Sequence, residues 1–89
     1  MNSFKVNALI LLELVNAKKK HPGWPEDPVH AVAILNEEAG ELTQACLDFT
    51  YDDKSIEQAM IEAAQCGAMV IRFLSNVEKY KRVKSKGVI

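Results

Sequence analysis

Four glutamates on two segments of the chain could together bind a divalent cation. Glu37, Glu38 and Glu41 lie in one short segment, where about 100° of helical turn per residue puts their side chains within about 100° of arc. Glu62 lies in a second, alanine-rich segment. Magnesium and manganese prefer carboxylate oxygens, whereas the histidines and cysteines of this chain lack zinc spacing. The pattern therefore predicts an all-oxygen site for magnesium or manganese.

The charges around these glutamates favour a bound cation. No basic residue occurs between His30 and Lys54, so nothing nearby relieves the repulsion between acids three and four residues apart, about 0.2–0.5 kcal/mol per pair. Ile34 projects in nearly the same direction as Glu38, so the carboxylates border the apolar face, where they need compensation. The alternative is a solvated acidic helix, which is common in proteins.

Three helices are expected to position these acids, over residues 3–19, 28–50 and 55–80. The segment between the first two holds three prolines and a glycine, which break a helix. Asp27 and Pro28 suit a helix start, and Ser55 with Gln58 predicts a capping box on the third helix. No strand pattern competes. The expected fold class is all-α, a single domain over residues 1–89 that forms a small antiparallel bundle of three main helices.

The first helix is apolar on two sides, and such helices are usually buried on both. Its first stripe comprises Phe4, Ala8, Leu11, Leu12 and Val15, and its second comprises Val6, Ile10, Leu14 and Ala17. One side can face the chain's own core, and we expect the second stripe to contact another copy, so that oligomerisation completes the bundle. The buried side of the third helix is expected to comprise Ile56, Ala59, Met60, Ala63, Gly67, Val70, Ile71 and Leu74.

The composition is that of a small globular domain. Of 89 residues 48% are hydrophobic, and the net charge of −1 gives no pull toward nucleic acid or an anionic membrane. The apolar residues 8–15 fall far short of the roughly 20 needed to span a bilayer. Cys46 and Cys66 are predicted to be reduced core thiols, which suits a cytoplasmic location. The basic segment 78–86 is too short for a DNA recognition unit.

The two acidic motifs resemble those of the MazG-like all-helical nucleoside triphosphate pyrophosphohydrolases. That family carries EExxE on one helix and ExxD on the next. The corresponding residues here read Glu37-Glu38-Ala39-Gly40-Glu41 and Glu62-Ala63-Ala64-Gln65. The resemblance covers residues 30–74, half of the chain, and points to short members carried by phages and mobile gene cassettes. The departure is Gln65, where the family has aspartate.

The resemblance implies hydrolysis of a nucleoside triphosphate between its α and β phosphates, giving a nucleoside monophosphate and pyrophosphate. Glu38, Glu41 and Glu62 would hold magnesium or manganese, and Gln65 could offer its carbonyl oxygen to the metal. Glu37 would orient or deprotonate the attacking water. Family members usually act as homodimers or homotetramers. The alternative is a non-catalytic nucleotide-binding, metal-binding or dimerisation module derived from the same fold.

Four further residues are candidates for binding the substrate: Arg72, Lys79, His30 and Trp24. Arg72 and Lys79 follow Gln65 at seven-residue steps and could contact phosphate, although a solvated basic face is an equal alternative. His30 lies two turns before Glu37 on the same side of the helix, or is simply exposed. Trp24 could stack on a base, but a tryptophan among prolines is more often a loop anchor against the core.

Overall fold

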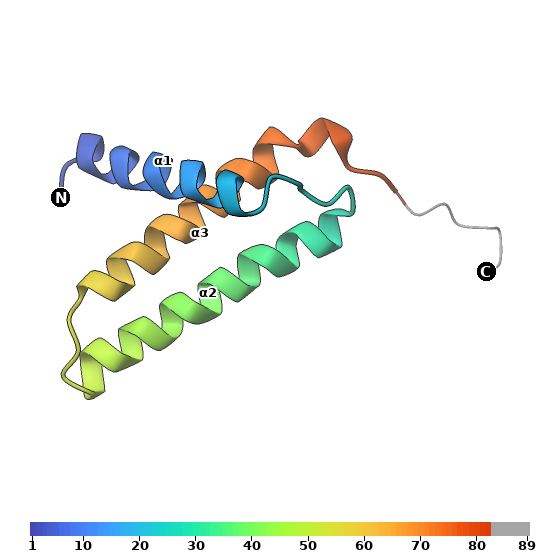
Figure 1. Ribbon diagram of the computed structural model, residues 1–89. Helices are drawn as coiled ribbons and strands as arrows, with labels where there is room; N and C mark the ends of the chain where they lie inside the picture. The colour runs from blue at the N-terminus through green and yellow to red at the C-terminus, as the bar shows by residue number, and fades with distance from the viewer. Residues whose placement is uncertain (83–89) are drawn as a thin grey trace, which may run out of the picture.

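The computed structural model describes residues 1–82, which form three long helices and one short one (Figure 1). The long helices are α1 (Ser3–Lys20), α2 (Pro28–Tyr51) and α3 (Glu57–Ser75), and a turn of 3-10 helix, η1 (Val77–Lys79), follows them. These residues contain no strand, so the predicted all-α class is confirmed. Residues 83–86 of the basic segment lie outside the described part of the chain.

The first two long helices begin where their free amide groups can be capped. Asn2 Oδ1 accepts a hydrogen bond from the Lys5 amide at 2.9 Å, and Asp27 Oδ1 accepts one from the Val29 amide at 2.8 Å. Pro28 occupies the first position of α2, where its fixed φ suits a helix and its missing N–H costs nothing. The predicted start of the second helix is confirmed, and the loop between α1 and α2 holds the prolines.

The predicted capping box of the third helix is wrong. Ser55 Oγ accepts a hydrogen bond from the Glu57 amide, but the Gln58 side-chain amide donates to Glu62 Oε1 at 2.9 Å instead of reaching back to Ser55. The predicted end is also wrong, because α3 stops at Ser75 instead of residue 80. There the Asn76 backbone amide donates a hydrogen bond to the Phe73 carbonyl oxygen, and the chain continues into η1.

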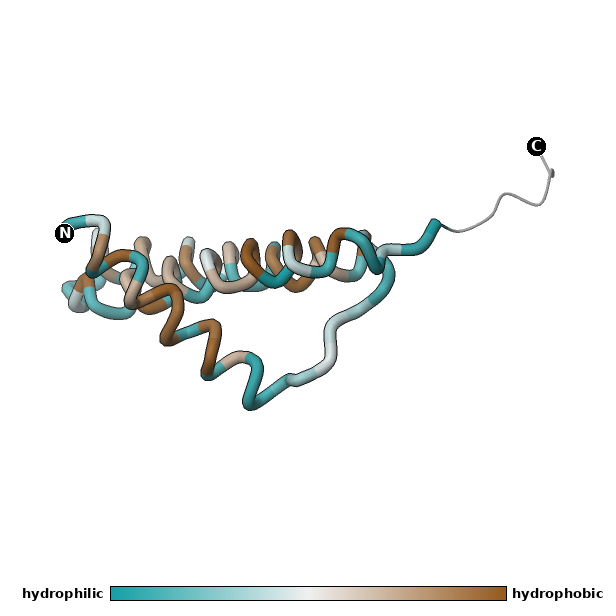
Figure 2. The backbone as a smooth tube through the Cα atoms, turned by 90° about the horizontal axis from the view of Figure 1, so that it is seen from above, coloured by the Kyte–Doolittle hydropathy of each residue, from teal (hydrophilic) through white to brown (hydrophobic). Residues whose placement is uncertain are grey.

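Helix α3 is central to the fold (Figure 1). It runs antiparallel to α2 after a short turn, and it also packs against α1. Within residues 1–82 the backbones of α1 and α2 do not approach each other, and α1 leaves the layer of α2 and α3 at an angle (Figure 2). The radius of gyration is 16.0 Å, against about 12 Å for a compact domain of this length. The described chain is therefore more open than a closed three-helix bundle.

The contact between the helices uses mostly small side chains. Within residues 1–82 seven apolar residues are buried. Five are alanines, namely Ala31, Ala45, Ala59, Ala64 and Ala68, and the other two are Leu14 and Met69. Small side chains let helix axes approach closely. Gly67 has the same function against α1, since a Cβ added there would lie 2.9 Å from the Ile10 side chain. Among the described residues no large side chain is fully buried.

The two stripes of α1 have the opposite roles from those expected. The stripe of Ile10 and Leu14, assigned above to a second copy, packs on α3: Leu14 is buried with Ala68 and Met69. The other stripe is exposed, with Phe4 at 86% and Leu11 at 54% of the accessibility of a free residue. The expected self-association surface was therefore wrong in position, and the apolar face of α1 without a partner in the described chain is the stripe that contains Leu11.

The expected buried side of α3 is only partly correct. Ala59 is buried, but Ile56, Val70 and Leu74 are exposed. The buried side also includes two charged residues, Glu62 and Arg72. Both cysteines are free, but Cys46 is exposed, which contradicts its expected core position, and Cys66 is half-buried. No helix within residues 1–82 combines the length and apolar character needed to cross a membrane.

Candidate metal centre and adjoining cleft

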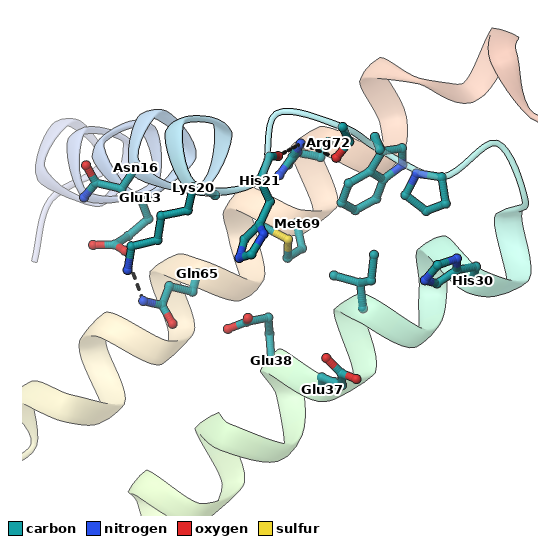
Figure 3. Close-up of a pocket in the computed structure, with 15 residues that line it drawn as sticks. Glu13, Asn16, Lys20, His21, His30, Glu37, Glu38, Gln65, Met69 and Arg72 are labelled. Atoms are coloured by element: carbon teal, nitrogen blue, oxygen red, sulfur yellow. Dashed lines mark hydrogen bonds between the residues drawn. The ribbon is translucent and has the colours of Figure 1, made fainter.

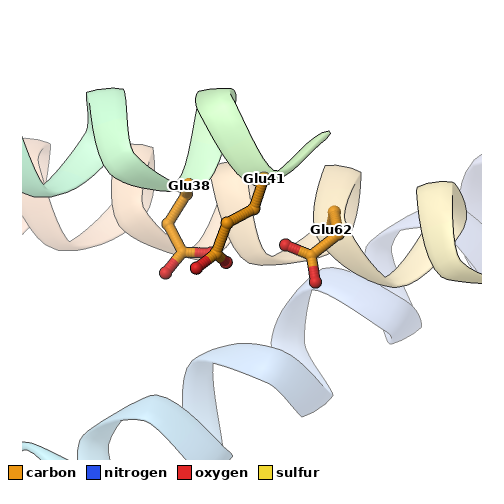
Figure 4. Close-up of side chains that lie close together, drawn as sticks. All are labelled: Glu38, Glu41 and Glu62. Atoms are coloured by element: carbon orange, nitrogen blue, oxygen red, sulfur yellow. The ribbon is translucent and has the colours of Figure 1, made fainter. Parts of the chain in front are cut away.

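Three of the four predicted glutamates converge at the contact between α2 and α3. One carboxylate oxygen from each of Glu38, Glu41 and Glu62 lies within 4.8 Å of the other two. Figure 4 shows these carboxylates pointing toward one another, two from α2 and one from α3. Glu38 and Glu41 are one turn apart on α2, and the antiparallel packing of α3 brings Glu62 beside them. The predicted meeting of acids from two helices is confirmed as an arrangement of side chains.

Burial makes this arrangement unusual for acidic side chains. Glu62 is 8% exposed, and Glu38 is half-buried. Glu62 Oε1 accepts the hydrogen bond from Gln58, but Oε2 has no partner in the described structure, and neither has Glu38 Oε2. A buried acceptor without a partner costs about 1–3 kcal/mol, and more when it is charged. A cation between the helices would give both oxygens a partner.

The electrostatics of the cluster agree with its burial. Burial raises the pKa of Glu38, and the charges of Glu41, Glu62 and Glu37 raise it further. Burial also raises the pKa of Glu62, as does the neighbouring carboxyl of Glu41, whereas the hydrogen bond from Gln58 lowers it. Burial followed by the charge of Glu38 raises the pKa of the Cys66 thiol, so this cysteine stays protonated and is a poor nucleophile. A divalent cation would offset the repulsion among the carboxylates.

A cleft of about 580 Å³ adjoins the acidic cluster (Figure 3). Its sides are formed by α1 and α2, and α3 lies between them. Glu37 and Glu38 line it from α2, while Lys20 and His21 line it from the end of α1 and the following loop. The cleft therefore joins an acidic end to a region with a fixed positive charge, and its volume is typical of small-molecule sites.

Gln65 lies next to the cluster but outside the group of three carboxylates. It lines the cleft, and its side-chain amide nitrogen donates a hydrogen bond to Glu13 Oε1 of α1 at 3.1 Å (Figure 3). Glu62 and Gln65 are three residues apart, so they lie on one side of α3. Sequence reasoning did not select Glu13, although it is the one charged residue in the apolar segment 8–15.

Arg72 and Trp24, both predicted as substrate ligands, hold the loop between α1 and α2 against α3. Arg72 is 5% exposed, and its Nη2 donates hydrogen bonds to the carbonyl oxygens of His21 at 2.7 Å and Gly23 at 3.1 Å. Its guanidinium lies 4.8 Å from the centre of the Trp24 ring. Trp24 Nε1 donates to Tyr80 Oη at 2.9 Å. Both side chains also line the cleft, so they shape its wall as well as fix the loop.

Of the remaining predicted residues, two line the cleft and one lies outside it. His30 and Glu37 both line the cleft from α2 and are exposed. Lys79 is exposed in η1 and does not line the cleft. Its expected column with Gln65 and Arg72 does not form, because α3 ends at Ser75. Five of the predicted site residues line the cleft together with Glu38, namely Trp24, His30, Glu37, Gln65 and Arg72.

Comparisons with known proteins give no match. No protein-family model matches the chain, and neither a curated protein nor a solved structure is significantly similar to it.

Proposed function

We propose that this protein is a divalent-cation-dependent nucleoside triphosphate pyrophosphohydrolase of the MazG-like kind. The observation that carries the proposal is the nine-tenths buried carboxylate of Glu62, whose Oε2 has no hydrogen-bond partner, with oxygens of Glu38 and Glu41 within 4.8 Å of that carboxylate. An acid is rarely buried this deeply without a charge partner. In residues 1–82 the one ion pair, Lys81 with Glu26, lies elsewhere.

The donor set fits magnesium or manganese. It consists of oxygen atoms alone, from Glu38, Glu41 and Glu62, and hard divalent cations bind carboxylates while keeping open positions for water and phosphate. Glu41 is exposed, so the cluster can be reached from solvent. When bound, the cation would neutralise charge on the triphosphate and lower the pKa of the attacking water.

In this proposal the cleft holds the nucleotide. The triphosphate lies toward Glu38, and Lys20 contributes positive charge at the α1 side of the same cleft. The base is held against the apolar part of the wall, where Ile34, Met69 and the Trp24 ring line the cleft. Aromatic and apolar side chains bind a base by stacking and burial.

Glu37 is the residue that would act on the attacking water. Glu37 lies exposed on the cleft wall beside Glu38, where it can accept the proton of the attacking water. The water oxygen bonds to the α phosphorus, the bond between that phosphorus and the bridging oxygen breaks, and pyrophosphate leaves with the bond electrons. The products are a nucleoside monophosphate and pyrophosphate.

Association of two or four copies would complete the fold. Leu11, Leu12 and Val15 are about half exposed on one side of α1, and the seven-residue apolar core is small for a chain of this length. Exposed contiguous apolar surface of this kind marks interaction sites.

A release assay for pyrophosphate tests the proposal. The full chain is incubated with magnesium or manganese and a panel of normal and modified nucleoside triphosphates. We expect pyrophosphate release that Glu37→Gln reduces at least about 100-fold, as for loss of a general base, and that Glu38→Gln also reduces, because it removes a cation ligand. Glu78→Gln, at an exposed acidic residue of η1, is the matched control and should keep wild-type activity.

The second candidate is a non-catalytic module that binds nucleotide or metal. It is favoured by Gln65, because the amide carries no charge where the resembled family has an aspartate. If no triphosphate yields pyrophosphate while manganese still raises the melting temperature, this second candidate replaces the first.

A further inference from the structure

Glu13 is a carboxylate on α1 that lines the cleft beside the acidic cluster and lies outside the group of three carboxylates within 4.8 Å. It is half-buried and lines the same cleft as Glu38. Its Oε1 accepts the hydrogen bond from Gln65, the residue one turn after Glu62 on α3. Figure 3 shows Glu13 and Gln65 together on the side of the cleft formed by α1 and α3. The one charged side chain of the apolar segment 8–15 therefore lies in the same cleft as Glu37 and Glu38.

The charge of Glu13 is close enough to act on the cluster. It lies on the wall of the cleft that Glu37 and Glu38 line from α2, and it contacts Gln65, one turn after Glu62. Within residues 1–82 no ion pair involves Glu13, and the nearest fixed positive charge on its helix that lines the cleft is Lys20, two turns away. Placing a further negative charge here costs free energy unless a cation is bound.

We propose that Glu13 supplies a fourth carboxylate to the divalent-cation site, from α1, and that Gln65 is the positioning residue that holds it there. The inference rests on the cation site proposed above. Glu62 provides the independent sign of a ligand, because its buried Oε2 lacks a partner. One consequence concerns the fold: the α1 and α2 backbones do not approach each other in the described chain, so a cation bound by Glu13 and Glu38 would join them.

Calorimetric titration of the full chain with manganese chloride tests this, without any need for turnover. Glu13→Gln should weaken manganese binding about tenfold, the low end of the effect of removing a group that supports a metal site. Gln65→Ala keeps every charge but removes the donor that orients Glu13, so it should weaken binding about threefold. Glu78→Gln removes one exposed acid elsewhere and should leave the affinity unchanged.

A double variant separates a role at the cation from a contact between helices. Adding Gln65→Asp to Glu13→Gln moves the carboxylate from α1 to the adjacent position on α3, one turn from Glu62. Manganese affinity should return to within about threefold of wild type if the site needs the charge, while Glu13→Gln alone keeps a contact between α1 and α3, because its amide can still bond to Gln65. Circular dichroism melts check that each variant is folded, and Gln65→Ala tests the inference even if Glu13→Gln does not fold.

The outcomes distinguish this inference from the proposed function. If Glu38→Gln abolishes manganese binding while Glu13→Gln and Gln65→Ala bind like wild type, the cation site stands and Glu13 has no part in it. If the wild-type chain binds no manganese, the cation site and the role of Glu13 are both wrong. A tenfold loss that Gln65→Asp does not restore overturns the assignment of Glu13 as a ligand and leaves it as a contact between helices.

Discussion

Replacing Glu62 by glutamine is expected to stabilise the cation-free protein and to remove most of its stabilisation by magnesium or manganese. Glutamine has nearly the same shape, can still accept the hydrogen bond from Gln58 and carries no charge. The change therefore removes the repulsion of Glu62 by Glu38 and Glu41 and the buried charge whose Oε2 has no partner, at the cost of one cation ligand.

The size of the effect follows from the geometry. Two unit charges 4.8 Å apart repel by about 3.5 kcal/mol at an effective dielectric constant of 20. The charge is spread over two oxygens, and Glu41 is exposed to solvent, so a net gain of about 1–2 kcal/mol is expected for Glu62→Gln. In a domain of this length this raises the melting temperature by about 5–15 °C. A cation at ten times its dissociation constant stabilises the wild type by about 1.4 kcal/mol.

Thermal melts followed by circular dichroism at one protein concentration measure both effects. At pH 8 without metal, Glu62→Gln should melt above wild type, and 10 mM magnesium or manganese should narrow or reverse the difference. Glu78→Gln controls for the loss of one negative charge. The reasoning is refuted if Glu62→Gln melts at or below wild type in the absence of metal, or if the cation raises both melting temperatures equally.

Without metal, the free energy of unfolding should fall as the pH rises from 4.5 through the raised pKa values of Glu38 and Glu62, because a carboxyl with a raised folded pKa favours the fold only while protonated. A denaturant titration at several pH values that shows a rise instead would contradict this. Gly40→Ala should add about 1 kcal/mol of stability, since nothing lies within 4 Å of the new Cβ, whereas Gly67→Ala should add less because its Cβ would meet an α1 side chain. Equal gains in denaturant melts would show that α1 does not pack closely there. Leu11→Lys, on the exposed side of α1, should shift the mass measured by light scattering toward 9.9 kDa without loss of helicity, and a wild-type mass of 9.9 kDa would end the association proposal.

The helices were predictable because their signals are local. The prolines after Lys20 and the cap at Asp27 set one boundary, and these act within a few residues. The end of α3 was not predictable in this way. Residues 76–80 keep a helical pattern, but Tyr80 donates a hydrogen bond to the Phe73 carbonyl and accepts one from Trp24, which is 56 residues distant. A tertiary contact of this kind is invisible in a local pattern.

The buried faces were partly wrong because a stripe of large apolar residues does not always face the neighbouring helix. The contact of α3 with its neighbours is close and uses Ala64, Ala68 and Gly67, while larger apolar residues such as Leu74 stay exposed. Close helix contacts favour small side chains. A prediction that looks for large apolar residues at helical spacing does not select such small residues as the buried face. The same bias assigned the wrong stripe of α1 to a second copy.

The meeting of Glu38, Glu41 and Glu62 needed only helical spacing and one assumption, that the second and third helices pack along their apolar sides. Glu13 needed more, since its position depends on how α1 lies across α3. Gln65 illustrates the difference. Seen in the motif alone, it is an amide where the resembled family has an acid, and it would suggest a site that has lost charge. In the fold, its amide donates to Glu13, so a carboxylate from another helix lies next to Gln65. The glutamine at position 65 is therefore weak support for a site that has lost catalysis. A carboxylate such as Glu13 needs a hydrogen-bond donor beside it, and the amide of Gln65 supplies that donor.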